Sequence, residues 1–378
     1  MRPIRRLLKV IAVLGLTLTA CGVDAPTGEV GAAPTGAAPS APADDGSASE
    51  TTAASSDDTA AGPDGEETVS VALVVNGELG DESFFDSANR GMERARDELG
   101  VDIRVIETGY EPASWEPGLR SAAASGEHDL IITGTFPMTD ILGAVAADFP
   151  DQRFVFYDAG LPGVDNIYSV TYAQNEGSFL AGAFAGLATT SDELANSNPE
   201  TVIGFVGGLD LPVINDFLVG YEQGAQFVDP AIEVLSAFAG DFADPARGLE
   251  LATTQINQGA DIVYQVAGGT GLGIIEAATN LDRYAIGVDS NQNPLAPGVV
   301  LTSMLKNVDN SLFRAIELFL DDQLPFGEVE VLGIAEGGVG LATDELYEEH
   351  VPESIRTRMA EIEQMVESGE ITVETALE

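Results

Sequence analysis

Short hydrophobic runs recur along the chain from residue 68 onward, and turn-forming residues separate them. Most of the runs are apolar throughout instead of alternating with polar residues, which is typical of parallel strands covered on both faces. The predicted strands lie at residues 69–75, 102–106, 130–133, 153–157, 167–170, 202–206, 232–238, 262–266, 284–288 and 299–304.

Longer stretches with a helical pattern of apolar residues lie between these strands. The predicted helices lie at residues 83–99, 115–125, 139–149, 177–187, 213–227, 246–258, 271–280, 310–322 and 352–368. Alternation of strands and helices predicts a doubly wound α/β fold. Five strands precede residue 172 and five follow it, so we expect two similar Rossmann-like lobes.

The first 67 residues have a different character. Residues 1–20 begin with basic side chains and continue with an apolar run from Val10 to Leu18, as in a secretory signal peptide. The segment from Leu18 to Gly22 resembles a bacterial lipoprotein box, in which cleavage precedes the cysteine and its sulfur is acylated. We therefore expect lipidation of Cys21 and a cell-membrane anchor on the extracytoplasmic face. The alternative is an ordinary cleavage site beside an incidental cysteine.

Residues 21–67 form the next predicted region. After Cys21 they are dominated by small, polar and acidic residues and contain no aromatic residue, leucine or isoleucine. Such a segment cannot bury enough apolar surface to fold, so we expect a disordered acidic linker.

Charge narrows the possible partners. The 378 residues contain 62 acidic and 16 basic side chains, a formal charge of −46. This surface repels phosphate backbones, so we expect no nucleic-acid partner. A single cysteine excludes a disulfide within the chain and a thiolate metal cluster, and the two histidines lack metal-ligand spacing. We expect no metal and no cofactor.

We find no motif in the sequence that indicates an enzyme. It contains neither a Gly-x-Ser-x-Gly elbow nor a phosphate-binding P-loop. The glycine-rich run 268–273 follows a strand and precedes a helix, but Ile274 occupies the position of the last glycine of a dinucleotide loop. Ligands of open α/β sheets bind beyond the carboxyl ends of the strands. Two facing lobes would then form a cleft that closes on a solute.

Several segments at these strand ends share one resemblance. The first is Gly-Asp-Glu-Ser-Phe at residues 80–84, and the others are residues 176–182, 204–214, 240–248, 267–273, 287–290, 301–309 and 336–341. They resemble the basic membrane protein (Bmp/Med) family of ABC transporter substrate-binding lipoproteins, which has Gly-Asp-Lys-Ser-Phe-Asn at the first segment. The resemblance implies a type I periplasmic-binding-protein fold and a receptor that delivers purine nucleosides to an ABC permease and ATPase. It also implies a protein that is not an enzyme.

The resemblance further implies a hinge of three crossovers, near residues 172, 298 and 323. Residues 68–172 and 299–322 would form lobe 1, and residues 173–298 and 323–342 would form lobe 2. Residues 343–378 would add a C-terminal helical segment that covers a lobe. We expect a monomer.

Three of the implied ligand-binding residues would contact the base, and a fourth, Asn76, is assigned to no particular part of the ligand. Phe84 and Phe242 match the two aromatic walls that enclose a purine; the alternative for each is packing within the protein. Asp158 would lie on the purine edge. A carboxylate only accepts hydrogen bonds, which favours guanosine and inosine over adenosine; the alternative is a cap on the following turn. Asn76 offers a donor and an acceptor at the end of the first strand.

The remaining implied residues would hold the ribose. Asp289 would accept hydrogen bonds from its hydroxyls, or else cap the next helix. Gly268 and Gly269 would allow close backbone approach, or else form a tight turn. Lys306 is the only lysine after Lys9, and a flexible ammonium suits both a ribose oxygen and neutralisation of Asp289. A chance surface lysine is the alternative.

Some positions and some functions stay open at this point. Thr135, Phe136 and Gln292 are undecided cleft residues, whereas Trp115 is expected to pack or to lie on the surface. Phe85 replaces a family asparagine, which weakens the inference of ligand identity. The alternatives to a nucleoside receptor are a receptor for another small neutral solute such as a sugar, a signalling or surface-interaction lipoprotein, and a nucleoside hydrolase.

Overall fold

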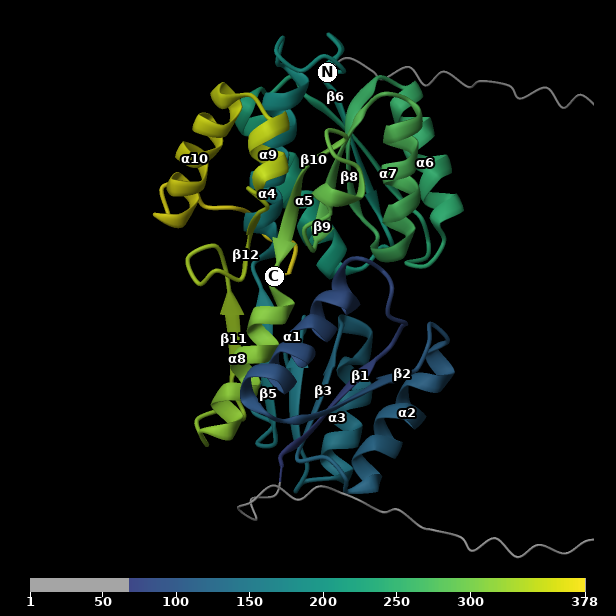
Figure 1. Cartoon of the computed structure of the whole chain (residues 1–378), viewed down its shortest axis with the longest axis vertical. Coiled ribbons are helices and arrows are strands. Elements are labelled where there is room, and N and C mark those ends of the chain that lie inside the picture. Colours follow the sequence, from purple (N-terminus) through teal and green to yellow (C-terminus); the bar gives the residue numbers. More distant parts are fainter. Residues whose placement is uncertain (1–67, 378) are drawn as a thin grey trace, which may run out of the picture. The chain divides into compact units, whose positions relative to one another are not determined.

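The computed structural model describes residues 68–377, which form two six-stranded sheets (Figure 1). The first sheet has the order β11-β5-β4-β3-β1-β2, and all of its strand pairs are parallel. Its strands are β1 (Ser70–Val75), β2 (Asp102–Glu107), β3 (Leu130–Gly134), β4 (Arg153–Tyr157), β5 (Ile167–Tyr172) and β11 (Val329–Leu332).

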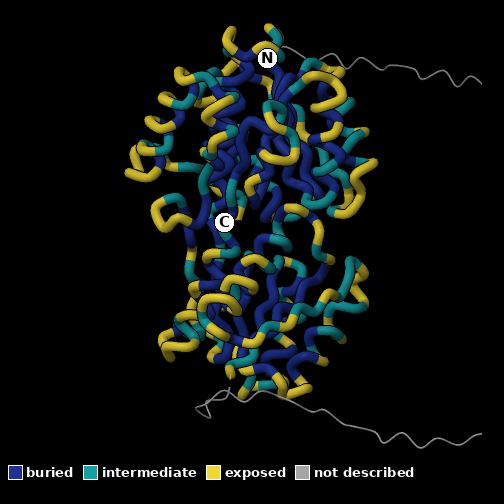
Figure 2. Tube along the Cα trace, in the orientation of Figure 1, coloured by how far each residue is buried: buried dark blue, intermediate teal, exposed yellow. Residues whose placement is uncertain are grey.

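The second sheet has the order β12-β10-β9-β8-β6-β7, and only the β10–β12 pair is antiparallel. Its strands are β6 (Val202–Gly207), β7 (Glu233–Phe238), β8 (Ala260–Val266), β9 (Tyr284–Asp289), β10 (Val300–Lys306) and β12 (Val339–Leu341). Strands β3, β6, β8 and β9 are buried along their whole length, and β1 and β4 are buried after their first residue (Figure 2).

Helices cover both faces of the first sheet because successive residues of its strands point to opposite faces. Val71 and Leu73 of β1 belong to the same core as α1 (Phe84–Leu99) and α8 (Val308–Leu320). Ala72 and Val74 pack with α2 (Pro112–Ser125) and α3 (Thr139–Asp148). This two-sided burial is why the strands read as continuous apolar runs.

The second sheet is covered in the same way. One face packs against α4 (Gln174–Thr189) and α5 (Pro212–Val228), and the other packs against α6 (Pro245–Asn257) and α7 (Gly271–Asn280). Glycines bring α4 and α5 into backbone contact: a Cβ atom at Gly220 would overlap the carbonyl oxygen of Asn175. The C-terminal helices α9 (Glu345–His350) and α10 (Glu353–Glu367) lie on this lobe, where α10 contacts α4.

All ten predicted strands and all nine predicted helices are present, with ends that differ by at most three residues. The sequence pattern missed the short elements β11, β12 and α9, as well as three 3₁₀ turns: η1 (Phe136–Met138), η2 (Gly268–Thr270) and η3 (Asn293–Leu295). None of the helices in residues 68–377 is long and apolar enough to cross a membrane. The predicted signal peptide, the Cys21 lipidation site and the acidic linker lie outside the described residues.

Two parts of the expected lobe assignment are wrong. Residues 299–322 were expected in lobe 1, but β10 pairs with β9 in the second sheet, and only α8 returns to the first sheet. Residues 323–342 were expected in lobe 2, but β11 pairs with β5 in the first sheet. The chain passes between the sheets after β5, after β10 and after β11. The number of crossovers is therefore as expected, while the last two occur later in the chain than residues 298 and 323.

Candidate ligand-binding site

The carboxyl ends of strands from both sheets surround one cavity of about 350 Å³. This volume lies at the small end of the range of small-molecule pockets, roughly 300–1,000 Å³. All eight residues predicted to bind ligand line it: Asn76, Phe84, Asp158, Phe242, Gly268, Gly269, Asp289 and Lys306. They come from seven separate stretches of chain, and the position of the strand ends is what brings them together.

Lobe 1 supplies Asn76 after β1, Asp158 after β4 and Phe84 at the start of α1. The Asn76 amide oxygen accepts a hydrogen bond from Thr135 Oγ1 at 3.0 Å. Thr135 and Asp158 both have left-handed backbone conformations, with φ of 77° and 64°. Such a turn directly after a strand is uncommon for a β-branched residue. These turns place both side chains at the cavity.

Lobe 2 supplies Phe242 after β7, Gly268 and Gly269 after β8, and Asp289 at the end of β9. The Phe242 carbonyl accepts a hydrogen bond from the Thr270 backbone N–H at 2.9 Å, which fixes the Phe242 loop against the β8 turn. The ring of Phe242 lies against Gly208, where any Cβ atom would overlap it. The glycine at 208, which sequence reasoning did not single out, therefore makes room for this aromatic wall.

Lys306 ends β10, and its side chain is only 2% exposed. Its Nζ atom lies 2.6 Å from Asp158 Oδ1, so this ion pair joins the second sheet to the first. Lys306 thus forms its ion pair with Asp158 and not with Asp289, although its positive charge still lowers the Asp289 pKa. The alternative of a surface lysine is wrong.

Aromatic rings surround the Lys306 ammonium. Its Nζ atom lies 4.7 Å from the ring centre of Phe217, 5.5 Å from that of Tyr172 and 5.6 Å from that of Phe84. Cation–π attraction at these distances partly offsets the loss of water around a buried charge. An ammonium has three donors, and Asp158 takes one of them.

Asp289 is a buried carboxylate with a different environment. Burial raises its pKa from 3.8 to about 6, while the positive charge of Lys306 and a 2.8 Å hydrogen bond from Ser83 Oγ oppose the change. The negative charges of Asp158 and Asp81 act in the same direction as burial. Its backbone is left-handed, with φ of 62°. Asp289 therefore stays protonated to a higher pH than an exposed aspartate does.

Asp81 also lines the cavity, although sequence reasoning gave it no separate role. Its carboxylate accepts hydrogen bonds from the backbone N–H groups of Ser83, Phe85 and Asp86 at 2.9–3.1 Å. These bonds satisfy donors in the first turn of α1. Asp81 thus shapes the loop that precedes Phe84. Burial raises its pKa, against the effect of these backbone hydrogen bonds.

The structure shows which of the positions that the sequence left undecided line the cavity. Thr135 and Phe136 line the cavity, whereas Gln292 is buried outside the lining and accepts a hydrogen bond from Gln265. Trp115 was expected to pack or to lie on the surface, but it also lines the cavity while its indole N–H binds the Gly109 carbonyl. Sequence reasoning missed further apolar lining residues at the start of α5, namely Leu211, Val213, Ile214 and Phe217. Their position after β6 was the signal that could have identified them.

Negatively charged side chains outnumber positively charged ones in the cavity lining. Lys306 faces five carboxylate side chains, those of Asp81, Glu111, Asp158, Asp241 and Asp289. An anionic ligand such as a nucleotide or a sugar phosphate would be repelled. The lining therefore disfavours anionic ligands and offers acceptors to a ligand with donors for hydrogen bonds.

Comparison with known proteins identifies the kind of protein. The profile of the Bmp family, described as ABC transporter substrate-binding protein PnrA-like, matches residues 68–372. Basic membrane protein D of Borreliella burgdorferi is 30% identical over 313 residues, which cover 81% of this chain and 88% of that protein. An uncharacterized lipoprotein of Pyrococcus furiosus is 33% identical over 287 residues, which cover 72% of this chain and 70% of that protein.

Solved structures agree with this result. An ABC transporter solute-binding protein from Aeropyrum pernix K1 is 28% identical and superposes with a TM-score of 0.75, covering 82% of this chain and 94% of that one. A periplasmic ribose ABC transporter protein from Conexibacter woesei, at 14% identity and a TM-score of 0.56, shares the fold. These neighbours confirm the periplasmic-binding-protein architecture.

The family and the neighbour from Aeropyrum pernix are solute-binding proteins and not enzymes, so they give no support to the hydrolase alternative. The family match runs through both lobes and includes all eight predicted site residues. The chain belongs to the Bmp family of ABC transporter substrate-binding proteins.

Proposed function

We propose that this protein is a lipid-anchored extracytoplasmic receptor that binds a purine nucleoside between its lobes and delivers it to an ABC permease and ATPase. The coarse part of this function, substrate binding for an ABC transporter, follows from family membership. The observation that supports the finer part is the convergence of two aromatic side chains and two acceptor carboxylates on one cavity.

The aromatic side chains suit a flat base. Phe84 comes from lobe 1 and Phe242 from lobe 2, so each lobe contributes one wall. Stacking on an aromatic ring contributes about 1–3 kcal/mol per base and needs no particular hydrogen-bond pattern. These rings therefore contribute affinity for the base, and the choice among bases falls to polar groups.

Asp158 is the polar group assigned to the base edge. Lys306 occupies its Oδ1 atom, and a carboxylate retains acceptor capacity on its second oxygen. Guanine and hypoxanthine present an N–H donor at N1, whereas adenine presents an acceptor there. We therefore assign guanosine and inosine as the preferred ligands.

Asp289, Lys306 and the Gly268–Gly269 turn are assigned to the ribose. The hydroxyls of a ribose are donors that an ionised carboxylate accepts, and the ammonium retains donors for a ribose oxygen. The excess of carboxylates in the lining favours an uncharged nucleoside over its phosphate.

Isothermal titration calorimetry tests the ligand. The protein from residue 22 onward, which retains every described residue, is titrated with guanosine, inosine, adenosine, guanosine monophosphate and ribose. Binding of guanosine and inosine ahead of adenosine, without binding of the monophosphate, is expected. No heat with any purine nucleoside would refute the assignment, and heat with ribose alone would support the sugar alternative.

The exchange Asp158→Asn tests the recognition of the base edge. A hydrogen bond to a charged group contributes about 1.5–3 kcal/mol, so guanosine affinity should fall roughly ten- to hundredfold more than adenosine affinity does. Asp241→Asn removes the same charge from the same cavity lining and is the matched control. Equal losses in both variants would mean that charge alone matters at this edge.

The anchor has a separate test. In cells that produce the full chain, Cys21→Ala should release the protein from the membrane fraction into the medium or the periplasm. Retention of this variant in the membrane would contradict lipidation at Cys21.

A further inference from the structure

The loop between β1 and α1 belongs to lobe 1 by its place in the chain, yet polar contacts attach it to lobe 2. Ser290 Oγ donates to the Ser83 carbonyl at 2.7 Å, and Ser83 Oγ donates to Asp289 Oδ2 at 2.8 Å. Gln292 Nε2 donates to the Glu82 carbonyl at 3.0 Å. We call these contacts between residues 82–83 and residues 289–292 the lobe seam.

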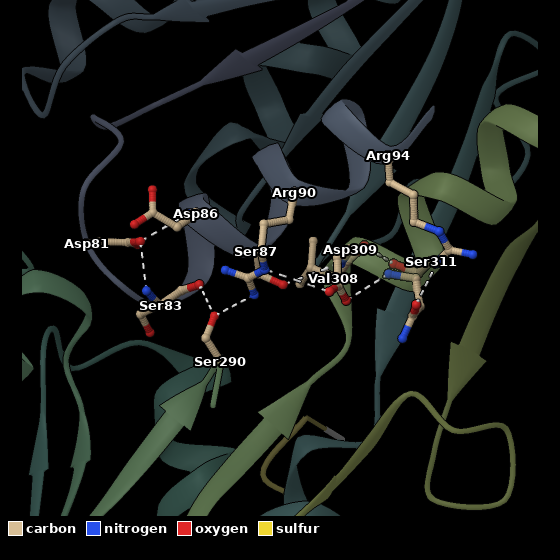
Figure 3. A network of polar contacts seen from close by, with 11 residues as sticks. Asp81, Ser83, Asp86, Ser87, Arg90, Arg94, Ser290, Val308, Asp309 and Ser311 are labelled. Carbon is tan, nitrogen blue, oxygen red and sulfur yellow. Dashed lines mark hydrogen bonds and ion pairs between the residues drawn. The ribbon is translucent and has the colours of Figure 1, made fainter. Parts of the chain in front are cut away.

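A charged side chain extends the lobe seam along α1. Arg90 Nη2 donates to Ser290 Oγ at 2.8 Å, and its guanidinium lies 3.9 Å from the Asp309 carboxylate on α8 (Figure 3). Ser290 thus both donates to lobe 1 and accepts from it. Ser83, Ser290 and Gln292 are almost completely buried.

The lobe 2 side of the seam is fixed from inside its own sheet. The Gln292 side-chain oxygen accepts hydrogen bonds from Gln265 Nε2 at 2.6 Å and from the Val288 backbone N–H at 3.1 Å. The Gln292 backbone N–H donates to Ser303 Oγ at 3.0 Å. Residues associated with β8, β9 and β10 therefore hold the amide that reaches across to Glu82.

The lobe 1 side is equally well held. Asp86 accepts hydrogen bonds from the backbone N–H groups of Gly80 and Glu82 at 2.8 Å, and Asp81 caps the first turn of α1. Phe84, a wall of the ligand cavity, directly follows Ser83. Any separation of the lobes at the seam would therefore move a cavity wall away from its opposite side.

We propose that Ser290 and Gln292 are positioning residues that hold the lobes together beside the cavity and thereby set the place of Phe84 for the ligand. The seam bonds join protein atoms to protein atoms, so they favour closure whichever solute is bound. Only the closed fraction of molecules binds with full affinity, so a seam that raises this fraction strengthens the apparent affinity. The use of guanosine as the probe rests on the proposed function.

The test compares four forms of the protein from residue 22 onward. They are the unchanged chain, Ser290→Ala, Gln292→Met and the control Ser197→Ala. Ser197 Oγ donates to the Ala188 carbonyl at 2.8 Å within lobe 2, so the control removes a hydrogen bond of similar length that does not cross between lobes. Small-angle scattering gives the radius of gyration with and without guanosine, and calorimetry gives the dissociation constant.

Both seam variants should have a larger radius of gyration than the unchanged chain without guanosine and the same radius at saturating guanosine. Guanosine should bind Ser290→Ala about thirtyfold more weakly, the effect of losing roughly two hydrogen bonds between the lobes. The control should match the unchanged chain. A variant that was merely misfolded would not recover its radius on adding ligand.

Unchanged radii and unchanged affinities in both seam variants would overturn the proposal. So would losses of affinity in Ser197→Ala as large as those in Ser290→Ala. If no purine nucleoside binds the unchanged chain, the proposed ligand fails, while the comparison of radii without ligand still decides whether the seam holds the lobes together.

Discussion

Replacing Asp289 by asparagine tests whether burial controls ionisation in the wall of the cavity. Burial raises the Asp289 pKa from 3.8 to about 6. The folded protein therefore takes up a proton at Asp289 more readily than the unfolded chain does. The stabilising effect of this proton is complete below about pH 3.8 and is lost as the pH rises through about 6.

The magnitude follows from the two pKa values. They differ by about 2, and each pKa unit corresponds to about 1.4 kcal/mol, so the ionised carboxylate costs about 3 kcal/mol of unfolding free energy above pH 7. The same relation gives about 2 kcal/mol at pH 5 and less than about 1 kcal/mol at pH 4. Asparagine at this position cannot ionise, so it avoids this cost at every pH.

Urea unfolding followed by circular dichroism between pH 4 and pH 8 measures the effect. The unfolding free energy of Asp289→Asn minus that of the unchanged chain should rise by about 2–3 kcal/mol across this range. The test is whether this difference in unfolding free energy varies with pH, because a difference that is the same at every pH reflects only the change from carboxyl to amide. Asp192→Asn, at an exposed carboxylate, is the control for the loss of one negative charge. A difference for Asp289→Asn that does not vary with pH would refute the reasoning from burial.

Two further predictions concern packing and charge. Lys306→Met leaves the Asp158 carboxylate, 8% exposed, without its ion-pair partner and should lower the unfolding free energy by about 3–5 kcal/mol. Lys306→Met combined with Asp158→Asn should recover part of this loss. An equal or larger loss in the double variant would contradict the ion pair. Gly220→Ala should destabilise the protein by about 1–3 kcal/mol in thermal unfolding, because the new methyl group overlaps the backbone of α4. Gly143→Ala, within α3 and with open space around it, should instead stabilise the protein by about 0.5–1 kcal/mol.

The closing of the lobes links these predictions to transport. The Lys306–Asp158 ion pair and the lobe seam both join the two sheets, the first through a pair of charges and the second through hydrogen bonds. Salt weakens exposed charge pairs but affects a pair this deeply buried much less. Closure should therefore tolerate changes in external salt concentration.

The sequence by itself determined the local elements and the family. Apolar runs covered on both faces predicted ten strands within a few residues of their ends, because burial on both sides removes polar residues from a strand. The rule that ligands bind at the carboxyl ends of parallel strands, together with the family resemblance, selected eight residues that line one cavity.

Only the tertiary structure decided which partners these residues have. The apolar pattern predicted β10 as a strand and missed β11, and the sheet in which each of them pairs depends on how the chain returns through the hinge, which no local pattern records. The same return brings Lys306 to Asp158 and leaves Asp289 with Ser83. Charge pairs and the lobe seam arise between residues about 150–210 positions apart, so their formation depends on the packing of two lobes and not on any local segment of sequence.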